Sequence, residues 1–303
     1  MSKIAAVVVT YNRKDMLLTC INNILRQSKG DPDVLVIDNA STDGTGDTVK
    51  EQFGSEPRVK YINTGANLGG AGGFSYGINV AVNQGYEYLW IMDDDTFPEE
   101  TALEALLKAD QILEGKYGFL SSYAKWTDGS ACEMNLPKVS GDWRYFVDTQ
   151  FNNKIMALES TSFVSFFVKS DVVREVGLPI KEFFIWGDDL EYSQRISTRY
   201  DSFFVYDSQV VHAIKSNIPT SIVDETDEQR IQRYKLLYRN KYYIARHSNK
   251  RAKMIYWLEI KYVLSDIMKR SKAQKWKKCS LVLKSCLAGL FFNPKVEKVH
   301  PVE

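Results

Sequence analysis

The chain has 303 residues, of which 44% are hydrophobic and 25% charged, and its formal net charge is +1. This length can bury a sizeable core and suits one large domain, or one domain with an appendage. The composition is that of an ordinary globular protein, and it excludes repeat and low-complexity architectures. No stretch approaches the roughly 18 apolar residues that a membrane-spanning helix needs.

The charges are divided unevenly along the chain. Residues 229–303 hold 19 Lys and Arg against 4 Asp and Glu, whereas residues 1–228 hold 20 against 34. The net charges of +15 and −14 predict an acidic body with a basic tail that meets an anionic surface. The four cysteines form no CxxC pair and the N-terminus shows no signal-peptide pattern, which favours reduced cysteines in the cytoplasm.

Strands and helices alternate through the first part of the chain. Continuous apolar runs predict three buried strands, at residues 4–9, 33–38 and 59–62. Apolar residues at helical spacing predict a helix between the first two strands, and a short helix to Phe53 precedes the third. This order implies a parallel sheet with right-handed crossovers. The polar loops at 10–13 and 39–45 must therefore lie on the same edge of the sheet.

A glycine-rich segment, Asn67-Leu68-Gly69-Gly70-Ala71-Gly72-Gly73-Phe74, leads into a helix that we expect to reach about Gln84. Four glycines in five residues let a backbone approach a ligand closely. The alternative is a plain flexible turn. The segment is not a GxGxxG fingerprint and the chain has no GxxxxGK[ST], so dinucleotide and P-loop sites are disfavoured.

Three carboxylates, Asp93, Asp94 and Asp95, end the next predicted strand. They sit at the carboxyl end of a strand, where open α/β sheets bind ligands. Adjacent carboxylates repel one another unless a cation lies among them, and a divalent metal with phosphate on its far side is the usual resolution. The alternative is a loop whose acids suit the dipole of the following helix.

A second acidic cluster follows in the middle of the chain. We expect a strand at 117–121, an irregular aromatic region at 124–160, and a strand at 162–168. Asp188 and Asp189 then open a helix directly after Trp186 and Gly187, which suits either helix capping or a sugar stacked on the indole. A strand at 202–205 precedes His212, which is either structural or a metal ligand.

The basic tail predicts a helix at 226–247 and two further amphipathic helices that carry Trp and Phe. Basic helices of this kind commonly lie on anionic membranes. Two alternatives remain, namely packing on the body or on a second subunit, and nucleic-acid binding, for which no recognition motif is present. We therefore predict domains at 1–222 and 223–303, a membrane partner, no nucleic-acid partner, and homo-oligomer formation as an option.

Four motifs in this order resemble family 2 inverting glycosyltransferases of the GT-A fold, and they cover roughly the first 215 residues. They are Val7–Arg13, Val36–Thr45, the triplet Asp93–Asp95, and Asp188–Glu191. The glycine segment and the full triplet look most like bacterial galactofuranosyltransferases. One departure is Gly187, because in those enzymes the tryptophan abuts the paired acids. The resemblance implies an α/β fold with a mostly parallel, Rossmann-like sheet flanked by helices, followed by the basic helical region.

The resemblance also implies a role for each matching residue. The residues expected at the nucleotide are Thr10, Tyr11, Asn12, Asp38, Asp93 and Asp94. Those expected along the diphosphate and donor sugar are Asn67, Gly69, Gly70, Gly72 and Gly73. Asp95 and His212, with Asp93, would hold Mn²⁺ or Mg²⁺, and Asp189 would be the general base. The residues expected near the acceptor are Trp186, Asp188 and Glu191.

The function implied is transfer of galactofuranose from UDP-galactofuranose to a cell-surface, lipid-linked glycan. The enzyme would lie in the cytoplasm, peripherally at the inner face of the cell membrane. A carboxylate base and a divalent ion suit a single displacement that inverts the anomeric centre. The alternatives are a rhamnosyltransferase that uses dTDP-rhamnose and a non-catalytic protein that binds sugar nucleotides.

Overall fold

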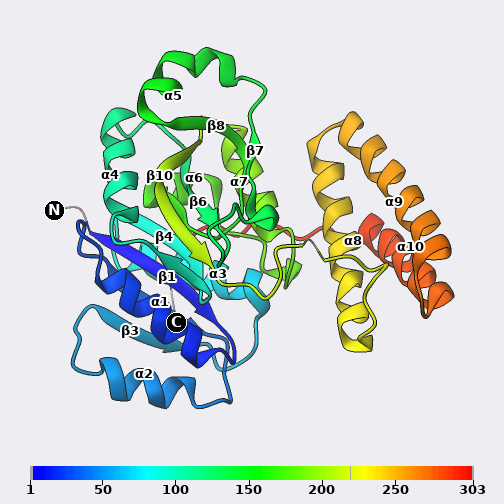
Figure 1. The fold of residues 1–303 in the computed structure, drawn as a ribbon, viewed down its shortest axis with the longest axis horizontal. Coiled ribbons are helices and arrows are strands. Elements are labelled where there is room, and N and C mark those ends of the chain that lie inside the picture. The colour runs from blue at the N-terminus through cyan, green and yellow to red at the C-terminus, as the bar shows by residue number, and fades with distance from the viewer. Residues whose placement is uncertain (1–2, 219, 302–303) are drawn as a thin grey trace.

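The computed structural model describes residues 3–218 and 220–301, and its larger part is a sheet flanked by helices (Figure 1). The strands are β1 (Ile4–Thr10), β2 (Asp33–Asp38), β3 (Val59–Asn63), β4 (Tyr88–Asp93), β5 (Thr96–Pro98), β6 (Phe119–Lys125), β7 (Lys138–Val139), β8 (Ile155–Ser160), β9 (Phe166–Lys169) and β10 (Phe203–His212). The helices are α1 (Lys14–Leu25), α2 (Thr45–Phe53), α3 (Gly69–Asn83), α4 (Ala102–Ile112), α5 (Val147–Asn153), α6 (Ser170–Val176) and α7 (Asp188–Ser197). Short 3₁₀ turns are η1 (Glu133–Asn135), η2 (Trp143–Phe146) and η3 (Lys181–Phe183).

The sheet has the strand order β3-β2-β1-β4-β9-β6-β10-β8-β7, and β5 pairs with β10. β1 runs parallel to both of its neighbours, so Thr10 lies opposite Asp38 and Val9 lies opposite Asp93. The predicted parallel arrangement of the first strands is confirmed. Beyond them the sheet is mixed, because β9 runs antiparallel to both β4 and β6. The parallel half brings the carboxyl ends of β1, β2 and β4 to one edge.

Both faces of β1 are buried, which explains its continuous apolar run. Ala6 and Val8 pack with residues of α1 and α4, whereas Ala5 and Val7 pack on the opposite face with residues of α3, α6 and α7. All four side chains are fully buried. A parallel strand with helices over both faces needs apolar residues at every position rather than at alternate ones.

The strand predicted at 162–168 is shorter in the structure and begins only at Phe166. Ser165 has a φ of +72°, which turns the chain out of the sheet. Its hydroxyl accepts a hydrogen bond from Trp90 Nε1 at 2.8 Å and lies 2.6 Å from Ser122 Oγ. These contacts with distant residues hold the turn, so the apolar pattern around Ser165 mispredicted the start of the strand.

Two further segments differ from the sequence-based expectation. The region 124–160 is not simply irregular, because it contains α5 and β8, and β8 pairs with β10. The strand predicted at 202–205 continues as β10 to His212, past an irregularity between Val205 and Gln209. This extension places His212 opposite Thr96 of β5, next to the acidic triplet.

Three helices form a bundle beside the sheet, with α8 nearest to it (Figure 1). They are α8 (Glu228–Ser248), α9 (Lys250–Arg270) and α10 (Lys275–Phe291). The bundle has its own core, in which the Tyr256 hydroxyl donates to the Tyr238 carbonyl at 3.0 Å and lies 3.0 Å from Cys286 Sγ. No helix in the described part of the chain has both the length and the apolar character needed to cross a membrane.

The last residues return from the bundle to the sheet. The backbone N–H of Leu178 donates to the Glu297 carbonyl at 2.8 Å, and Lys181 forms an ion pair with the Glu297 carboxylate. Farther along, the backbone N–H of His300 donates to Asn79 Oδ1 of α3 at 3.0 Å. The end of the basic region therefore packs on the α/β part, and the domain division at residue 222 stays a prediction.

Gly77 of α3 lies so close to the sheet that any side chain should weaken the fold. A Cβ at this position would lie 2.7 Å from both Val7 Cγ1 and Ile37 Cγ1. We expect Gly77→Ala to lower the free energy of unfolding, because overpacking costs about 1–3 kcal/mol. The better helix propensity of alanine offsets only about 0.5–1 kcal/mol of this cost. Urea unfolding measures the difference.

Gly141→Ala is the matched control, since a Cβ there meets nothing within 4 Å. It should change stability by less than about 0.5 kcal/mol. Equal stability of the two variants would contradict the close packing of α3 on β1 and β2.

Candidate active site

The polar residues at the ends of β1 and β4 meet at one sheet edge. Thr10 Oγ1 donates to Asp94 Oδ2 at 2.7 Å. Arg13 Nη1 lies 3.3 Å from Asp94 Oδ1 and also pairs with Asp95. Arg13 thus supplies the cation that the adjacent carboxylates require. The sequence interpretation quoted Arg13 in a motif but gave it no role, although a basic residue three positions after a strand end was a usable signal.

The three carboxyl groups of the triplet differ in proton affinity. Burial raises the pKa of Asp94 to about 6, although the Arg13 charge acts in the opposite direction. Burial, with the charges of Asp95 and Asp94, raises the pKa of Asp93 well above its usual range. Burial also acts to raise the pKa of Asp95, but the hydrogen bond and charge of His212, followed by Arg13, lower it overall. Asp95 is therefore the carboxylate of the triplet that most strongly keeps its charge.

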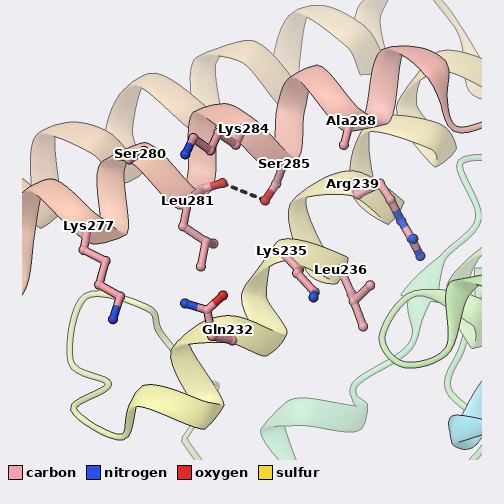
Figure 2. Close-up of a pocket in the computed structure, with 10 residues that line it drawn as sticks. All are labelled: Gln232, Lys235, Leu236, Arg239, Lys277, Ser280, Leu281, Lys284, Ser285 and Ala288. Carbon is pink, nitrogen blue, oxygen red and sulfur yellow. Dashed lines mark hydrogen bonds between the residues drawn. The ribbon is translucent and has the colours of Figure 1, made fainter.

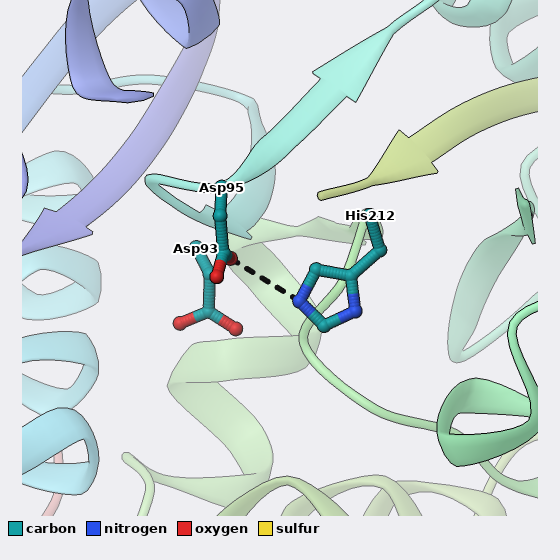
Figure 3. A group of neighbouring side chains, drawn as sticks. All are labelled: Asp93, Asp95 and His212. Atoms are coloured by element: carbon teal, nitrogen blue, oxygen red, sulfur yellow. Dashed lines mark hydrogen bonds and ion pairs between the residues drawn. The ribbon is translucent and has the colours of Figure 1, made fainter. Parts of the chain in front are cut away.

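Asp93, Asp95 and His212 converge on one point (Figure 3). Each offers one ligand atom, and these atoms all lie within 4.8 Å of one another. His212 Nε2 faces Asp95 Oδ1 at 3.2 Å. Two carboxylates and an imidazole are a ligand set that suits Mn²⁺, with Mg²⁺ as a competitor. The structure thus brings together the three residues that the sequence interpretation assigned to a metal.

Asn135 orients the imidazole of His212, and the sequence interpretation missed it. His212 Nδ1 lies 2.7 Å from Asn135 Oδ1, while Asn135 Nδ2 donates to Ser162 Oγ at 2.9 Å. Because the Asn135 amide donates to Ser162, its oxygen faces His212 and accepts a hydrogen bond from Nδ1–H. Nε2 is then the ring atom that faces the carboxylates. No local pattern marks Asn135, which lies in the region expected to be irregular.

The arrangement of His212 and Asp95 fits a divalent ion. With Nδ1 directed at Asn135, Nε2 of His212 and the Asp95 oxygen face each other at 3.2 Å. Such a pair is stable only with a proton or a metal ion between the two atoms. Metal-ligating histidines usually donate their second ring N–H to a fixed acceptor. Asn135 Oδ1 is that acceptor for His212.

The residues expected at the nucleotide lie around the same edge. Tyr11 is 43% exposed, so its ring is accessible to a base. Asn12 instead links two loops, because its Oδ1 accepts from the Thr42 backbone N–H at 2.7 Å. Asp38 is fully buried and accepts from the Tyr61 hydroxyl and from the Ser41 backbone N–H. Contact between Asp38 and a ligand therefore stays a prediction.

The glycine-rich segment forms the first turn of α3. Asn67 Oδ1 accepts from the Gly69 N–H at 2.9 Å, and Gly69 has a φ of +71°, the left-handed region that favours glycine. A Cβ on Gly69 would collide with the Phe184 carbonyl, and Gly72 lies against Leu68. Packing therefore accounts for these two glycines, and a Cβ on Gly73 would likewise lie 2.7 Å from Val9.

Gly70 differs from the other glycines of this segment. A Cβ at Gly70 would meet nothing within 4 Å, and the residue is partly exposed. Within the segment, Gly70 is thus the position where backbone can be approached by a ligand from open space.

The second acidic cluster opens α7. Burial raises the pKa of Asp188 to about 8, and the charge of Asp189 adds to the rise. Burial raises the pKa of Asp189 to about 6, opposed by the hydrogen bond from the Leu190 backbone N–H. At neutral pH, Asp189 is thus an ionised carboxylate with enhanced basicity.

The two acidic clusters lie close enough for their charges to interact. The charge of Asp188 contributes to the raised pKa of Asp93, after burial and the other two acids of the triplet. In addition, the Ala71 N–H of α3 donates to the Phe184 carbonyl at 3.2 Å, which joins the glycine segment to the loop before Asp188. The metal-binding candidates, the glycine segment and the paired acids therefore belong to one site.

The loop before Asp188 is held by α8, which the sequence interpretation did not foresee. Phe184 and Trp186 have φ values of +64° and +68°, which are strained for side-chain-bearing residues. Asn240 Nδ2 of α8 lies 3.1, 3.1 and 2.8 Å from the carbonyl oxygens of Phe183, Ile185 and Trp186. The bundle thus fixes the backbone that carries the paired acids.

Trp186 and Glu191, expected near the acceptor, both have protein partners. The Trp186 ring packs on Tyr234 of α8 with centroids 5.2 Å apart. Glu191 forms a two-pronged ion pair with Arg195, at 2.9 and 2.8 Å. Their roles toward an acceptor stay predictions.

Comparison with known proteins finds similarity mainly in the N-terminal region. Residues 5–114 match the sequence profile described as "Glycosyl transferase family 2". The chain is 28% identical over 198 residues to Galactofuranosyltransferase GlfT1 of Mycobacterium tuberculosis (strain CDC 1551 / Oshkosh), which covers 63% of each chain. It is 26% identical over 162 residues to Glycosyltransferase GlyG of Streptococcus pneumoniae serotype 4, which covers 48% of this chain and 53% of that protein. The chain thus spans less than two thirds of the relatives' length.

A solved structure supports the fold alone. The chain superposes on Staphylococcus aureus TarS with a TM-score of 0.55 at 16% identity, over 96% of this chain and 44% of TarS. The match confirms the predicted GT-A type of fold with its C-terminal helices.

Asn135 offers a test of the metal site. We expect Asn135→Leu to weaken Mn²⁺ binding about 10–100-fold, because the imidazole loses the acceptor that sets its tautomer. Calorimetric titration of Mn²⁺ into the protein without donor measures the affinity directly. Asn135→Asp keeps an acceptor and should stay close to the wild type. Equal affinities for wild type and Asn135→Leu would show that His212 does not need this orientation.

Proposed function

We propose that this chain, whose residues 5–114 belong to glycosyl transferase family 2, transfers galactofuranose from UDP-galactofuranose to a glycan acceptor with inversion. One observation carries the proposal. Three metal-ligand candidates and a raised-pKa carboxylate pair share one site at the carboxyl edge of the sheet. The metal-ligand candidates would bind the ion that a sugar-nucleotide donor needs. The carboxylate pair would supply the base for a displacement at the anomeric carbon of that donor.

The donor assignment draws on the comparisons. The similarity to Galactofuranosyltransferase GlfT1 extends over 198 residues, beyond the 110 residues of the family profile. The glycine segment and the complete acidic triplet are the features that separate galactofuranosyl from rhamnosyl donors in this proposal. A transferase that uses dTDP-rhamnose is the second candidate.

Asp95, His212 and Asp93 would hold a Mn²⁺ or Mg²⁺ ion. When bound, the ion would neutralise charge that develops on the UDP leaving group. Thr10, Tyr11 and Asp38 would lie against the uridine, and Gly70 would offer backbone to the diphosphate. Arg13 adds a further positive charge beside Asp94 and Asp95.

Asp189 would be the base. Its carboxylate takes the proton of the acceptor hydroxyl as that oxygen attacks the anomeric carbon from the side opposite UDP. Asp188, with the higher pKa, stays protonated at neutral pH and donates a hydrogen bond to the acceptor or donor sugar. One displacement suffices, so the configuration inverts and no covalent enzyme intermediate forms.

The acceptor would be a lipid-linked glycan of the cell envelope. The basic bundle supports a peripheral position at the inner face of the cell membrane, because anionic lipids attract basic helices. α9 and α10 expose large apolar side chains, including Trp257, Tyr262, Trp276 and Phe291. Exposed aromatic residues beside lysines suit a bilayer interface.

A donor panel tests the assignment. Incubation with UDP-galactofuranose, UDP-galactopyranose, UDP-glucose or dTDP-rhamnose, each with and without Mn²⁺, should release UDP only from the furanose donor, and only with metal. Release of dTDP alone would favour the rhamnosyl alternative. A donor that binds in calorimetry but is never turned over, even with a polyprenyl-diphosphate-linked glycan present, would favour a binding protein.

Asp189→Asn tests the base. Turnover should fall about 10²–10⁴-fold, while the dissociation constant for the UDP-sugar stays unchanged. Wild-type kcat/KM should be level at neutral pH and fall about tenfold per unit below pH 6, because protonated Asp189 accepts no proton. Asp171→Asn, an exposed acid on α6, is the control and should keep full activity. Near-normal turnover of Asp189→Asn would remove Asp189 from this role.

A further inference from the structure

A groove runs between α8 and α10 of the bundle (Figure 2). Its volume is about 520 Å³. Lys235 and Arg239 lie on the α8 side, and Lys277 and Lys284 lie on the α10 side. Among the described residues that line it, none is acidic, and apolar side chains such as Leu281 lie between the two rows of cations. The groove therefore combines a positive rim with an apolar floor.

Helix geometry accounts for the two rows. Lys235 and Arg239 are four residues apart, and Lys277 and Lys284 are seven apart, so each pair shares one helix face. Like charges four residues apart destabilise a helix by about 0.2–0.5 kcal/mol. The like-charged pair on α8 is thus a cost that an anionic ligand would offset.

Two of the four cations already have protein partners. The Arg239 guanidinium donates to the Glu182 carbonyl at 2.7 Å and lies 3.8 Å from the ring centroid of Phe292. Lys277 forms an ion pair with Glu228. Within residues 3–218 and 220–301, no ion pair involves Lys235 or Lys284, and both are exposed. These two lysines lie on opposite walls of the groove and are the cations most available to a ligand.

We propose that the groove binds the phosphate headgroup of an anionic phospholipid at a bilayer surface. The inference rests on the proposed membrane attachment and names the surface and the ligand chemistry. The phosphate would lie between Lys235 and Lys284. The exposed side chains of Leu283 and Leu287, 47% and 59% accessible, adjoin Lys284 on α10 and would meet the acyl chains.

Charge and apolar area together select this ligand class. An inorganic anion would leave the apolar floor exposed to water, whereas a neutral hydrophobe would leave the lysines unused. Single-stranded nucleic acids need aromatic platforms for base stacking, and none of the described lining residues is aromatic. An amphiphile with a phosphate head satisfies both parts of the groove.

Vesicle sedimentation with full-length protein tests the proposal. Vesicles of phosphatidylglycerol and phosphatidylcholine should bind the wild type, and Lys235→Gln with Lys284→Gln should weaken binding about thirty-fold, from about 1 kcal/mol for each lysine. The control, Lys261→Gln with Lys269→Gln, removes the same charge from exposed positions of α9 outside the groove and should weaken binding at least threefold less than the groove pair does. Lys235→Arg with Lys284→Arg should retain binding.

Several results would overturn the groove assignment. Equal losses in the two glutamine pairs would indicate diffuse attraction to the whole bundle. Displacement by soluble glycerol phosphate at matched phosphate concentration would indicate a phosphate site without lipid selectivity. A change from dimer to monomer in the groove variant, measured by sedimentation velocity without lipid, would indicate a subunit interface. If the wild-type protein does not sediment with anionic vesicles, the lipid-binding proposal is wrong.

Donor hydrolysis without vesicles separates this proposal from the transferase assignment. Both glutamine pairs should release UDP at the wild-type rate, because their lysines lie outside the active site. If the groove variant hydrolyses the donor and also binds vesicles like the wild type, the lipid site in the groove is contradicted. The transferase assignment would be unaffected.

Discussion

The burial of carboxylates at the sheet edge is the constraint on which the site depends. Asp94 and Asp95 are only 3% and 4% exposed, and a buried charge is costly unless it is paired. Arg13 from the loop after β1 and His212 from the end of β10 provide the pairing. Three segments must therefore meet at one point. The short β5 makes this meeting possible, because it pairs with β10 and sets His212 opposite Thr96, next to Asp95.

A second set of contacts joins the acceptor side of the site to the bundle. The loop before Asp188 contains two side-chain-bearing residues with positive φ, and its carbonyls are held by Asn240 of α8. Arg239, the next residue back along α8, binds the Glu182 carbonyl and also borders the groove between α8 and α10. The helices that carry the basic surface thus also shape the backbone around the paired acids, so the bundle is a part of the candidate active site.

The two acidic clusters divide the chemistry by their environments. His212 and Arg13 lower the pKa of Asp95 against the effect of burial, which suits a group that holds a cation. Asp189 lies at a helix start where burial prevails, which raises its pKa and suits a group that accepts a proton. The roles proposed for Asp95 and Asp189 therefore differ because their neighbours differ.

The sequence alone determined the alternating strands and helices, the sheet edge at which loops converge, both acidic clusters and three metal-ligand candidates. These features depend on local patterns, such as apolar runs buried on both faces and polar residues at strand ends. Tertiary structure alone decided the turn at Ser165 and the contacts of Asn135 and Asn240. His212 meets Asn135 across 77 residues of sequence, and Asn240 meets Trp186 across 54. Such contacts leave no local periodicity, because they depend on how separately formed elements pack together.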